Sequence, residues 1–221
     1  MNKRRQRIML YVLTIIALGF LTLTVLVSLF PDSNIDMYFS REIQEHQHPA
    51  LDHLMYWISC PGYMPQAPIM VVSTSIIFFL FKYKKAALYI LFTMLAGLVS
   101  TLVKVAVNRP RPSDTVVRIL QKTTQQSFPS GHVLFYVVFF GFLILLMYQL
   151  QGVSKVLRGI VIALCLLFIF SIPISRIYMG AHWFTDVVGG FLLGLICLYV
   201  LSWFYLRKRA DKQEAPVAET Q

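Results

Sequence analysis

Residues 132–150 read HVLFYVVFFGFLILLMYQL and contain no lysine, arginine, aspartate or glutamate. The hydrocarbon core of a bilayer is about 30 Å thick, so a helix needs roughly 20 apolar residues to cross it. This run has that length, and a helix built from it would be apolar on every face. It therefore predicts a membrane-spanning helix.

Five further apolar runs lie on either side of it, which predicts an all-α polytopic membrane protein with six transmembrane helices in a bundle. In chain order the runs are Ile8–Phe30, Tyr63–Phe81, Ala86–Val107, His132–Leu150, Gly159–Ile174 and Asp186–Leu206. The second and fifth are the weakest because prolines interrupt them. The first is longer than the apolar stretch of a signal peptide and no small-residue cleavage site follows it, so we expect a retained helix.

The composition of the 221-residue chain excludes several classes of protein. With 57% hydrophobic residues, 14% charged residues and a mean hydropathy of +0.65, it is neither a soluble globular enzyme nor a disordered chain. Three cysteines are too few, and odd in number, for a disulfide scaffold. The net charge of +10 would suit nucleic acid only if the basic residues formed one water-facing surface, whereas here they are spread between apolar runs.

The distribution of lysine and arginine predicts the orientation in the membrane, because cytoplasmic loops carry the excess of these residues. With the N-terminus inside the cell, most of the 20 lysines and arginines fall on the cytoplasmic side. They are Lys3, Arg4, Arg5, Arg7, Lys82, Lys84, Lys85, Lys155, Arg158, Arg207, Lys208, Arg209 and Lys212. We expect a multi-pass cell-membrane protein with both termini in the cytoplasm.

The chain divides into four parts under this topology. Residues 1–30 form the cytoplasmic start and first transmembrane helix, and residues 63–206 form the transmembrane core that carries the chemistry. Residues 31–62 mix acidic and apolar side chains, which predicts an extra amphipathic segment at the extracytoplasmic interface. Residues 207–221 read as a disordered cytoplasmic tail.

Three histidines in the interfacial segment, His46, His48 and His53, raise the question of a metal site. No cysteine or paired ligand helix accompanies them, so a solvated interfacial face fits them better.

A basic cluster ends the third apolar run, where residues 104–112 read KVAVNRPRP. A charged side chain near membrane depth is expensive and calls for a partner or a task, although Lys104 alone could be a snorkelling lysine. The two prolines stiffen the chain and hold Arg111 in a defined direction. Arg109 and Arg111 point to different sides of such an extended stretch, so we expect only one of them to face a pocket.

A second cluster, PSGH at residues 129–132, leads into the fourth run. Ser130 stands at a helix N-cap position, whose usual role is structural. A helix N-terminus also offers unpaired backbone N–H groups and a favourable dipole to an anion, and Gly131 lets an oxyanion come close to the backbone. His132 would then lie beside that anion.

The third cluster, SRIYMGAHWFTD at residues 175–186, leads into the sixth run. His182 and Asp186 are four residues apart, which places them on one face of a helix. A carboxylate that accepts one imidazole N–H leaves the other ring nitrogen free to act as a nucleophile. The alternative is a structural hydrogen bond at a helix start, and this pair considered alone favours that alternative.

Together the three clusters indicate phosphoryl transfer, in which catalysis consists mostly of positioning and of neutralising charge. All three fall on the extracytoplasmic side of the predicted topology. They supply three cations that match the charge of a phosphate monoester, about −1.5 to −2. The candidate residues are Lys104, Arg111, Ser130, Gly131, His132, Arg176, His182 and Asp186.

The spacing of these clusters resembles the three-part signature of the type 2 phosphatidic acid phosphatase (PAP2) superfamily. The matching patterns are Lys-x6-Arg-Pro at 104–112, Pro-Ser-Gly-His at 129–132 and Ser-Arg-x5-His-x3-Asp at 175–186. All three are intact and in order, and the resemblance covers residues 86–206. In overall build the chain is most similar to bacterial PgpB-type membrane lipid phosphatases.

The resemblance implies a membrane lipid phosphatase that works through a phosphohistidine. His182 would be the nucleophile, Asp186 would orient it, and His132 would be the general acid and base. The resemblance also implies a phosphate-binding set of Lys104, Arg111, Ser130, Gly131 and Arg176. It implies no metal and no cofactor, which agrees with the absence from the sequence of a carboxylate cluster suited to magnesium.

The implied substrate is an amphiphilic lipid phosphate that arrives through the bilayer. We expect phosphatidylglycerol phosphate first, then undecaprenyl diphosphate, then phosphatidic acid. A lipid phosphotransferase that uses the same phosphohistidine stays open. A transporter would show charges in mid-span or broken helices in matching halves, and neither is evident. A vanadate haloperoxidase shares the family's pocket chemistry, but those relatives are soluble.

Overall fold

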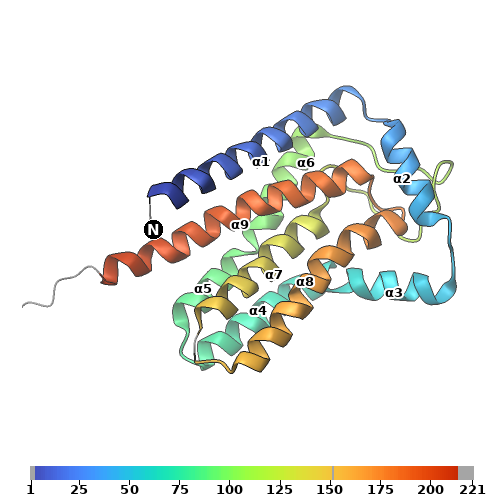
Figure 1. The fold of residues 1–221 in the computed structure, drawn as a ribbon. Coiled ribbons are helices and arrows are strands. Elements are labelled where there is room, and N and C mark those ends of the chain that lie inside the picture. Colours follow the sequence, from blue (N-terminus) through green and yellow to red (C-terminus); the bar gives the residue numbers. More distant parts are fainter. Residues whose placement is uncertain (1–2, 151, 214–221) are drawn as a thin grey trace, which may run out of the picture.

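The computed structural model describes residues 3–150 and 152–213, which form an all-helical bundle (Figure 1). The predicted fold class is therefore confirmed. In chain order the helices are α1 (Lys3–Leu29), α2 (Asn34–Gln44), α3 (Pro49–Ser59), the 3-10 turn η1 (Cys60–Gly62), α4 (Gln66–Leu80), α5 (Lys84–Phe92), α6 (Leu95–Val107), α7 (Gly131–Gln149), α8 (Lys155–Tyr178) and α9 (Phe184–Gln213).

Among the described residues, five stretches are long and apolar enough to cross a membrane: α1, α5 with α6, α7, α8 and α9. The predicted second span differs, because α4 has only 15 residues and is too short to cross a bilayer by itself. It forms a pair with α3 and η1, bent by 58°. Pro61 and Pro65 lie in and beside this bend, where proline cannot continue a regular helix. The six predicted spans thus correspond to five long stretches and one bent pair.

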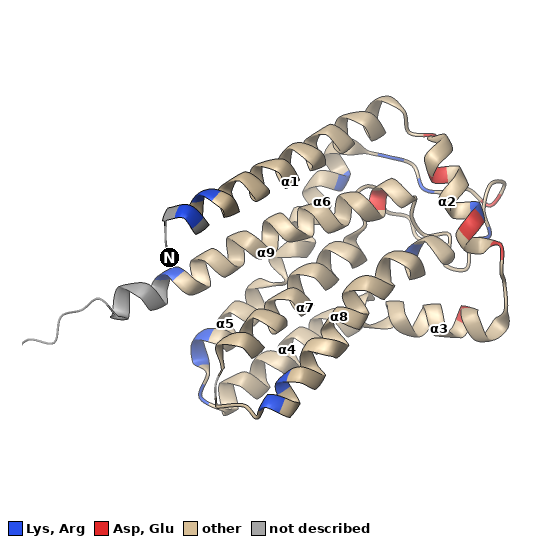
Figure 2. Cartoon of the chain, viewed as in Figure 1, with Lys and Arg blue, Asp and Glu red and all other residues tan. Residues whose placement is uncertain are grey.

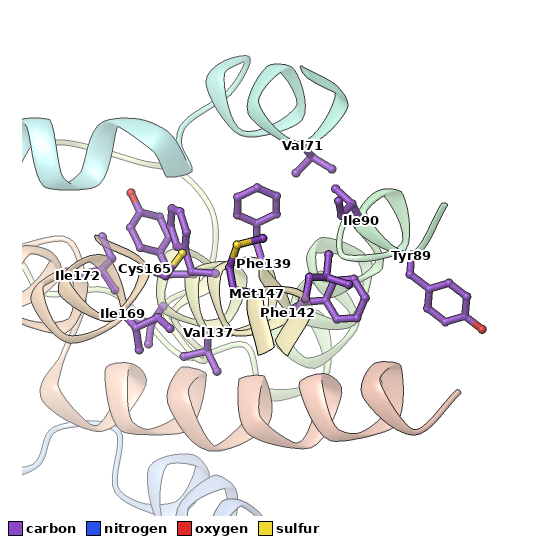
Figure 3. Packing of buried hydrophobic residues seen from close by; sticks show 14 of the residues in the cluster. Val71, Tyr89, Ile90, Val137, Phe139, Phe142, Met147, Cys165, Ile169 and Ile172 are labelled. Atoms are coloured by element: carbon purple, nitrogen blue, oxygen red, sulfur yellow. The ribbon is translucent and has the colours of Figure 1, made fainter. Parts of the chain in front are cut away.

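Helix α7 lies at the centre of the bundle, between α8, α9 and the α5–α6 pair (Figure 1). In the membrane-spanning part of α7, 61% of the residues are buried, compared with 6% in α1. Because α7 is apolar on every face, burying all of it requires neighbours on every side. Figure 3 shows part of the resulting core, to which α7 contributes Val137, Phe139, Phe142 and Met147 and α8 contributes Cys165, Ile169 and Ile172.

The outer helices present large apolar side chains on the surface of the bundle. Examples on α1, α4, α6 and α8 are Ile15, Leu21, Leu29, Phe79, Leu80, Leu102, Val105, Leu167 and Phe170. A water-soluble monomer rarely exposes such a continuous apolar surface. Facing lipid, the same side chains cost nothing, so this surface agrees with a multi-pass membrane protein.

The two ends of the bundle differ in charge (Figure 2). Lysine and arginine gather at the starts of α1, α5 and α8 and towards the end of α9. The acidic residues whose side chains are described lie at the opposite end, on and beside α2, on α3, before α7 and at the start of α9, and that end carries lysines and arginines as well. This separation fits a basic cytoplasmic end, and the orientation itself stays a prediction.

The structure describes all of the predicted interfacial segment and only the first part of the predicted tail. The predicted interfacial segment, residues 31–62, contains α2, α3 and η1. Its histidines are exposed, and His48 caps α3 by accepting a hydrogen bond from Ala50 N. In the predicted disordered tail, residues 207–221, helix α9 continues to Gln213, and residues 214–221 lie outside the described part.

Glycines of α9 let it approach the start of α7 closely. A Cβ atom on Gly190 would lie 2.6 Å from Ser130 O, and one on Gly194 would lie 2.8 Å from Val137 Cβ. Real Cβ atoms do not come this close to other heavy atoms. Ser130 and Val137 therefore pack against α9 at positions where α9 has glycine and no side chain. These glycines serve packing within one chain.

We expect Gly190→Ala to lower the thermal unfolding midpoint of the detergent-purified protein. The added methyl group forces the backbone at Ser130 to move, and overpacking of this kind costs about 1–3 kcal/mol. Gly159→Ala on α8 is the matched control, because a Cβ there meets nothing within 4 Å. Equal midpoints for the two variants would contradict the close approach.

Candidate active site

Three stretches distant in sequence meet at the acidic end of the bundle. Helix α6 ends at Asn108, whose φ of 50° gives the left-handed C-cap that commonly terminates a helix. Between α8 and α9 the chain turns at Gly180, which has a φ of 65° and whose Cβ would collide with the backbone of Arg118. Only glycine meets both conditions. These turns bring the last turns of α6 and α8 towards the first turns of α7 and α9.

His182 lies in the turn before α9, two residues before the helix begins at Phe184, so it does not share a helix face with Asp186 as predicted. Its Nδ1 is 3.6 Å from Asp186 Oδ2 and has no hydrogen-bond partner, so the predicted hydrogen bond from the imidazole to the carboxylate is not formed. The carboxylate is fully buried and is held by donors from Trp183 N (2.9 Å), Arg109 Nη1 (2.7 Å) and the hydroxyl of Ser127. Asp186 is therefore fixed in place, with its negative charge beside the ring of His182.

Lys104, Arg111 and Arg176 line the same cavity as His182. Arg111 Nη1 is 3.4 Å from His182 Nε2. Lys104 and Arg176 are buried, at 5% and 2% exposure, and Arg111 is partly buried. Among the ion pairs of the described residues, none involves these three cations.

Within the described part of the chain, Lys104, Arg111 and Arg176 donate their hydrogen bonds to neutral groups and not to carboxylates. Backbone carbonyls of residues 125–127 accept from Lys104 and Arg111, and Arg176 Nη1 donates to Ser59 Oγ (3.0 Å) and Tyr63 Oη (2.9 Å). Among the described residues the three basic side chains therefore have neutral acceptors and no carboxylate partner, which is the property of an anion-binding site.

Arg109 has the opposite environment although it lies two residues from Arg111. It is 2% exposed and forms ion pairs with Asp186 and Asp36, each at 2.7 Å. It does not line the cavity beside His182, whereas Arg111 does. Arg109 is thus compensated by two carboxylates, and Arg111 is the arginine of this motif that faces the pocket.

The start of α7 completes the site. Ser130 occupies the N-cap position, yet its buried Oγ makes no hydrogen bond. Gly131 and His132 line the cavity, and the Nε2 atom of His132 is buried without a partner. The His132 ring packs edge-on against Tyr63, with 4.8 Å between ring centroids. His132 thus shares the cavity with the three cations, and Ser130 precedes it in the chain, at the N-cap of α7.

The cavity has a volume of about 410 Å³ and changes character along its length. Around His182 it is lined by the cations and by polar residues of the loop before α7: Gln121, Thr123 and Gln125. Towards the lipid-facing helices it is lined by Met64, Ala67, Pro68, Met94, Gly97 and Phe135. Such a cavity suits a molecule with a charged group at one end and an apolar body.

The surroundings of His182 set its charge state. Burial lowers the pKa of His182 well below its ordinary value of 6.5, and the nearby charges of Arg111, Lys104 and Arg176 lower it further. The imidazole is therefore neutral near pH 7. Burial, together with the charge of Arg176, lowers the pKa of Arg111 to about 10, so this guanidinium keeps its charge.

The structure brings all eight predicted site residues to one region and adds residues that the sequence did not reveal. Ser127 binds Asp186, Tyr63 contacts both Arg176 and His132, and Asp36 reaches the site from α2 through Arg109. Asp36, Ser40 and Gln44 are buried polar residues spaced four apart on α2. That spacing was a signal that one face of the interfacial segment packs against the core.

Sequence comparison identifies the family. A model of the PAP2 superfamily matches residues 85–210, more than half of the chain, and this region contains all three clusters. The chain belongs to the PAP2 superfamily. This membership confirms the resemblance on which the predicted site residues rest.

The chain aligns with individual curated relatives over part of their length. It is 30% identical over 144 residues to phosphatidylglycerophosphatase B of Bacillus subtilis, an alignment covering 62% of this chain and 66% of the relative. It is 26% identical over 179 residues to lipid phosphate phosphatase delta of Arabidopsis thaliana, covering 76% and 41%. The chain thus spans less than two thirds of the length of these relatives.

A solved PAP2 structure shares the fold. The transmembrane PAP2 type phosphatidylglycerolphosphate phosphatase from Bacillus subtilis superposes with a TM-score of 0.76 at 24% identity. The match covers 93% of this chain and 98% of the other. The arrangement of helices around α7 is therefore that of a known transmembrane PAP2 protein.

The two neighbouring arginines should respond differently to substitution. Arg109→Gln leaves two buried carboxylates without their cation, and breaking a buried ion pair costs about 3–5 kcal/mol. Arg111→Gln removes a cation with no carboxylate partner, so the fold should keep its stability. Thermal unfolding of both variants in detergent checks this contrast, and an equal loss in both would contradict the assignment of Arg109 as the structural arginine.

Proposed function

We propose that this chain is an integral membrane lipid phosphatase that hydrolyses phosphatidylglycerol phosphate through a phosphohistidine intermediate. One observation carries the proposal: the neutral imidazole of His182 has its Nε2 atom 3.4 Å from Arg111 Nη1 and shares a cavity with Lys104 and Arg176, and among the described residues none of these three cations has a carboxylate partner. An imidazole in such surroundings is a nucleophile placed where an anionic electrophile binds.

The charges of the site match a phosphate monoester. Taking an ion out of water costs several kcal/mol unless an opposite charge compensates it. A phosphate monoester with about −1.5 to −2 charge supplies that compensation for Lys104, Arg111 and Arg176. The backbone N–H groups at the start of α7, next to Ser130 and Gly131, add donors for the phosphoryl oxygens.

The proposed reaction has two steps at phosphorus. His182 Nε2 attacks, the bond from phosphorus to the lipid oxygen breaks, and His132 donates a proton to that oxygen. His132 then takes a proton from water, whose oxygen attacks phosphorus, and the bond to His182 breaks to release phosphate. Asp186, beside Nδ1, stabilises the positive charge that the ring carries in the intermediate.

The shape of the cavity supports a lipid substrate. Its apolar part is lined by residues next to or on α4 and α6, helices whose outer faces are exposed to the membrane. A lipid can therefore enter sideways with its acyl chains still in the bilayer. Phosphate and a polar headgroup would lie at the charged part, next to the loop before α7.

The lining favours a monoester over a diphosphate. Among the described residues around the cavity, Lys104, Arg111 and Arg176 are the lysines and arginines, so a second phosphate would meet no cation of its own. Gln121, Thr123 and Gln125 offer neutral hydrogen-bonding groups that suit the hydroxyls of a glycerol headgroup. The name of the Bacillus subtilis relative, phosphatidylglycerophosphatase B, points to the same substrate.

The charge separation between the two ends of the bundle supports the location of the reaction. With the basic end in the cytoplasm, the cavity lined by His182 and Arg111 lies at the extracytoplasmic end of the bundle. We therefore propose that the enzyme acts on lipid phosphates at the extracytoplasmic face of the membrane.

The decisive test measures phosphate release by detergent-purified protein from phosphatidylglycerol phosphate, phosphatidic acid and undecaprenyl diphosphate. We expect release in the presence of EDTA without an added acceptor, fastest with phosphatidylglycerol phosphate, and none from His182→Ala, which should keep its thermal midpoint. Activity in His182→Ala would remove the mechanism. Transfer to an alcohol without free phosphate would identify a phosphotransferase, and loss in EDTA restored by magnesium would indicate another catalyst.

The pH dependence of kcat/KM should follow from the two histidines. Because the pKa of His182 is lowered, Nε2 stays unprotonated as the pH falls through 6.5, and the rate should decline only below that value. On the alkaline side the rate should fall when His132 can no longer donate a proton, which gives a bell-shaped profile. A flat profile, or an acidic limb centred above pH 6.5, would contradict this assignment.

A further inference from the structure

Helix α2 places one buried carboxylate beside the catalytic core. Asp36, Ser40 and Gln44 lie on its inner face, at 1%, 2% and 7% exposure, and α2 packs against α8 and α9. The burial of Gln44 is explained by its hydrogen bonds, because its side-chain amide binds the backbone of Arg118 and Tyr178. Asp36 is the charged member of the set, and it lies outside residues 85–210, to which the family model extends.

Asp36 contacts the two residues that flank Asp186 in space and in sequence. Its Oδ2 accepts from Arg109 Nη2 at 2.7 Å and from Thr185 Oγ1 at 2.9 Å. Its Oδ1 accepts from Thr185 N at 2.8 Å. That N–H belongs to the first turn of α9, where backbone donors have no partner within the helix. Asp36 therefore caps, from another element, the helix turn that carries Asp186.

The charges of this group do not cancel. Arg109 binds both Asp36 and Asp186, all three residues are at most 2% exposed, and one arginine with two aspartates has a formal charge of −1. A single arginine–aspartate pair would be neutral. The second carboxylate leaves a surplus negative charge behind His182, on the opposite side of the ring from the three cations.

We infer that Asp36 is a positioning residue for the reaction proposed above. Through Arg109 and Thr185 it fixes the orientation of Asp186, and it supplies the surplus negative charge that stabilises the imidazolium of the phosphohistidine. The inference depends on the proposed function, because it assigns Asp36 a role in the attack by His182.

The first test compares Asp36→Asn with wild type and with Asp32→Asn in the proposed phosphatase assay. Asparagine keeps the shape of the side chain and removes its charge, and Asp32 is an exposed carboxylate of the same segment. A small displacement of catalytic groups costs about 100-fold in rate, so we expect Asp36→Asn to lower kcat by that order. KM and inhibition by inorganic phosphate should not change, because Lys104, Arg111 and Arg176 do not contact Asp36.

The pH profile separates a catalytic contribution from a purely structural one. His182 is faced by Arg111, Lys104, Arg176 and His132 on the cavity side and by Asp186 with Arg109 behind it, and all of them remain in the variant. Removing the negative charge of Asp36 disfavours the imidazolium, so the acidic limb of kcat/KM should move to lower pH. A residue that only attaches α2 to the bundle would lower the fraction of active enzyme and leave the limb in place.

A second variant covers the case in which Asp36→Asn does not fold. Thr185→Val removes the hydroxyl that links Asp36 to Arg109 and keeps the backbone N–H, so it should lower kcat in the same direction by a smaller factor. The inference would be overturned if folded Asp36→Asn or Thr185→Val had the same kcat as the wild-type protein, or if the acidic limb did not move. In that case phosphate release by the wild-type protein would still support the proposed function. Wild-type protein that releases no phosphate would overturn both.

Discussion

The buried guanidinium of Arg109 holds the site end of the bundle together. It donates to Pro31 O and Asp36 on one side and to Thr185 and Asp186 on the other. In sequence, Asp36 lies 73 residues before Arg109 and Asp186 lies 77 residues after it. Removing one partner from a buried ion pair costs about 3–5 kcal/mol, because the remaining charge is left without compensation. The start of α2, the end of α6 and the start of α9 must therefore assemble together, and the position of Asp186 follows from this assembly.

The same motif contains a second arginine with the opposite electrostatics. Pro110 separates Arg109, which has two carboxylate partners, from Arg111, which has none. Had Arg111 been paired in the same way, the protein would be more stable, and its charge would not be available to an anion. The unpaired cations thus carry a cost in the empty site that a bound phosphate relieves, as expected where function is favoured over stability.

The sequence predicted best what depends on local pattern. Uninterrupted apolar runs such as α7 became membrane helices, since their length and composition decide the matter without reference to the rest of the fold. The second span was predicted as one helix over residues 63–81. The structure has a bent pair there, because prolines interrupt the run and α4, with 15 residues, is too short to cross a bilayer alone. The alternation of side chains around Pro110 indicated that one arginine would face the pocket, but which one depends on Asp36, a residue 73 positions away. Asp36 and Asp32 look alike in sequence, and only the contacts of α2 distinguish them.

The location of the site suits the proposed lipid substrate, whose phosphate belongs in water and whose acyl chains belong in the bilayer. A doubly charged phosphate does not enter hydrocarbon, and acyl chains do not leave it, so the reacting atom of a membrane lipid is held near the level where helices end. Side chains in the last turns of α6 and α8 and the first turns of α7 and α9 reach that level from a rigid bundle. The membrane already restricts the depth and orientation of the lipid, so the protein has only to neutralise the phosphate and present one imidazole. That division explains how so few charged residues, joined to an apolar cavity that opens towards lipid, are enough for the proposed chemistry.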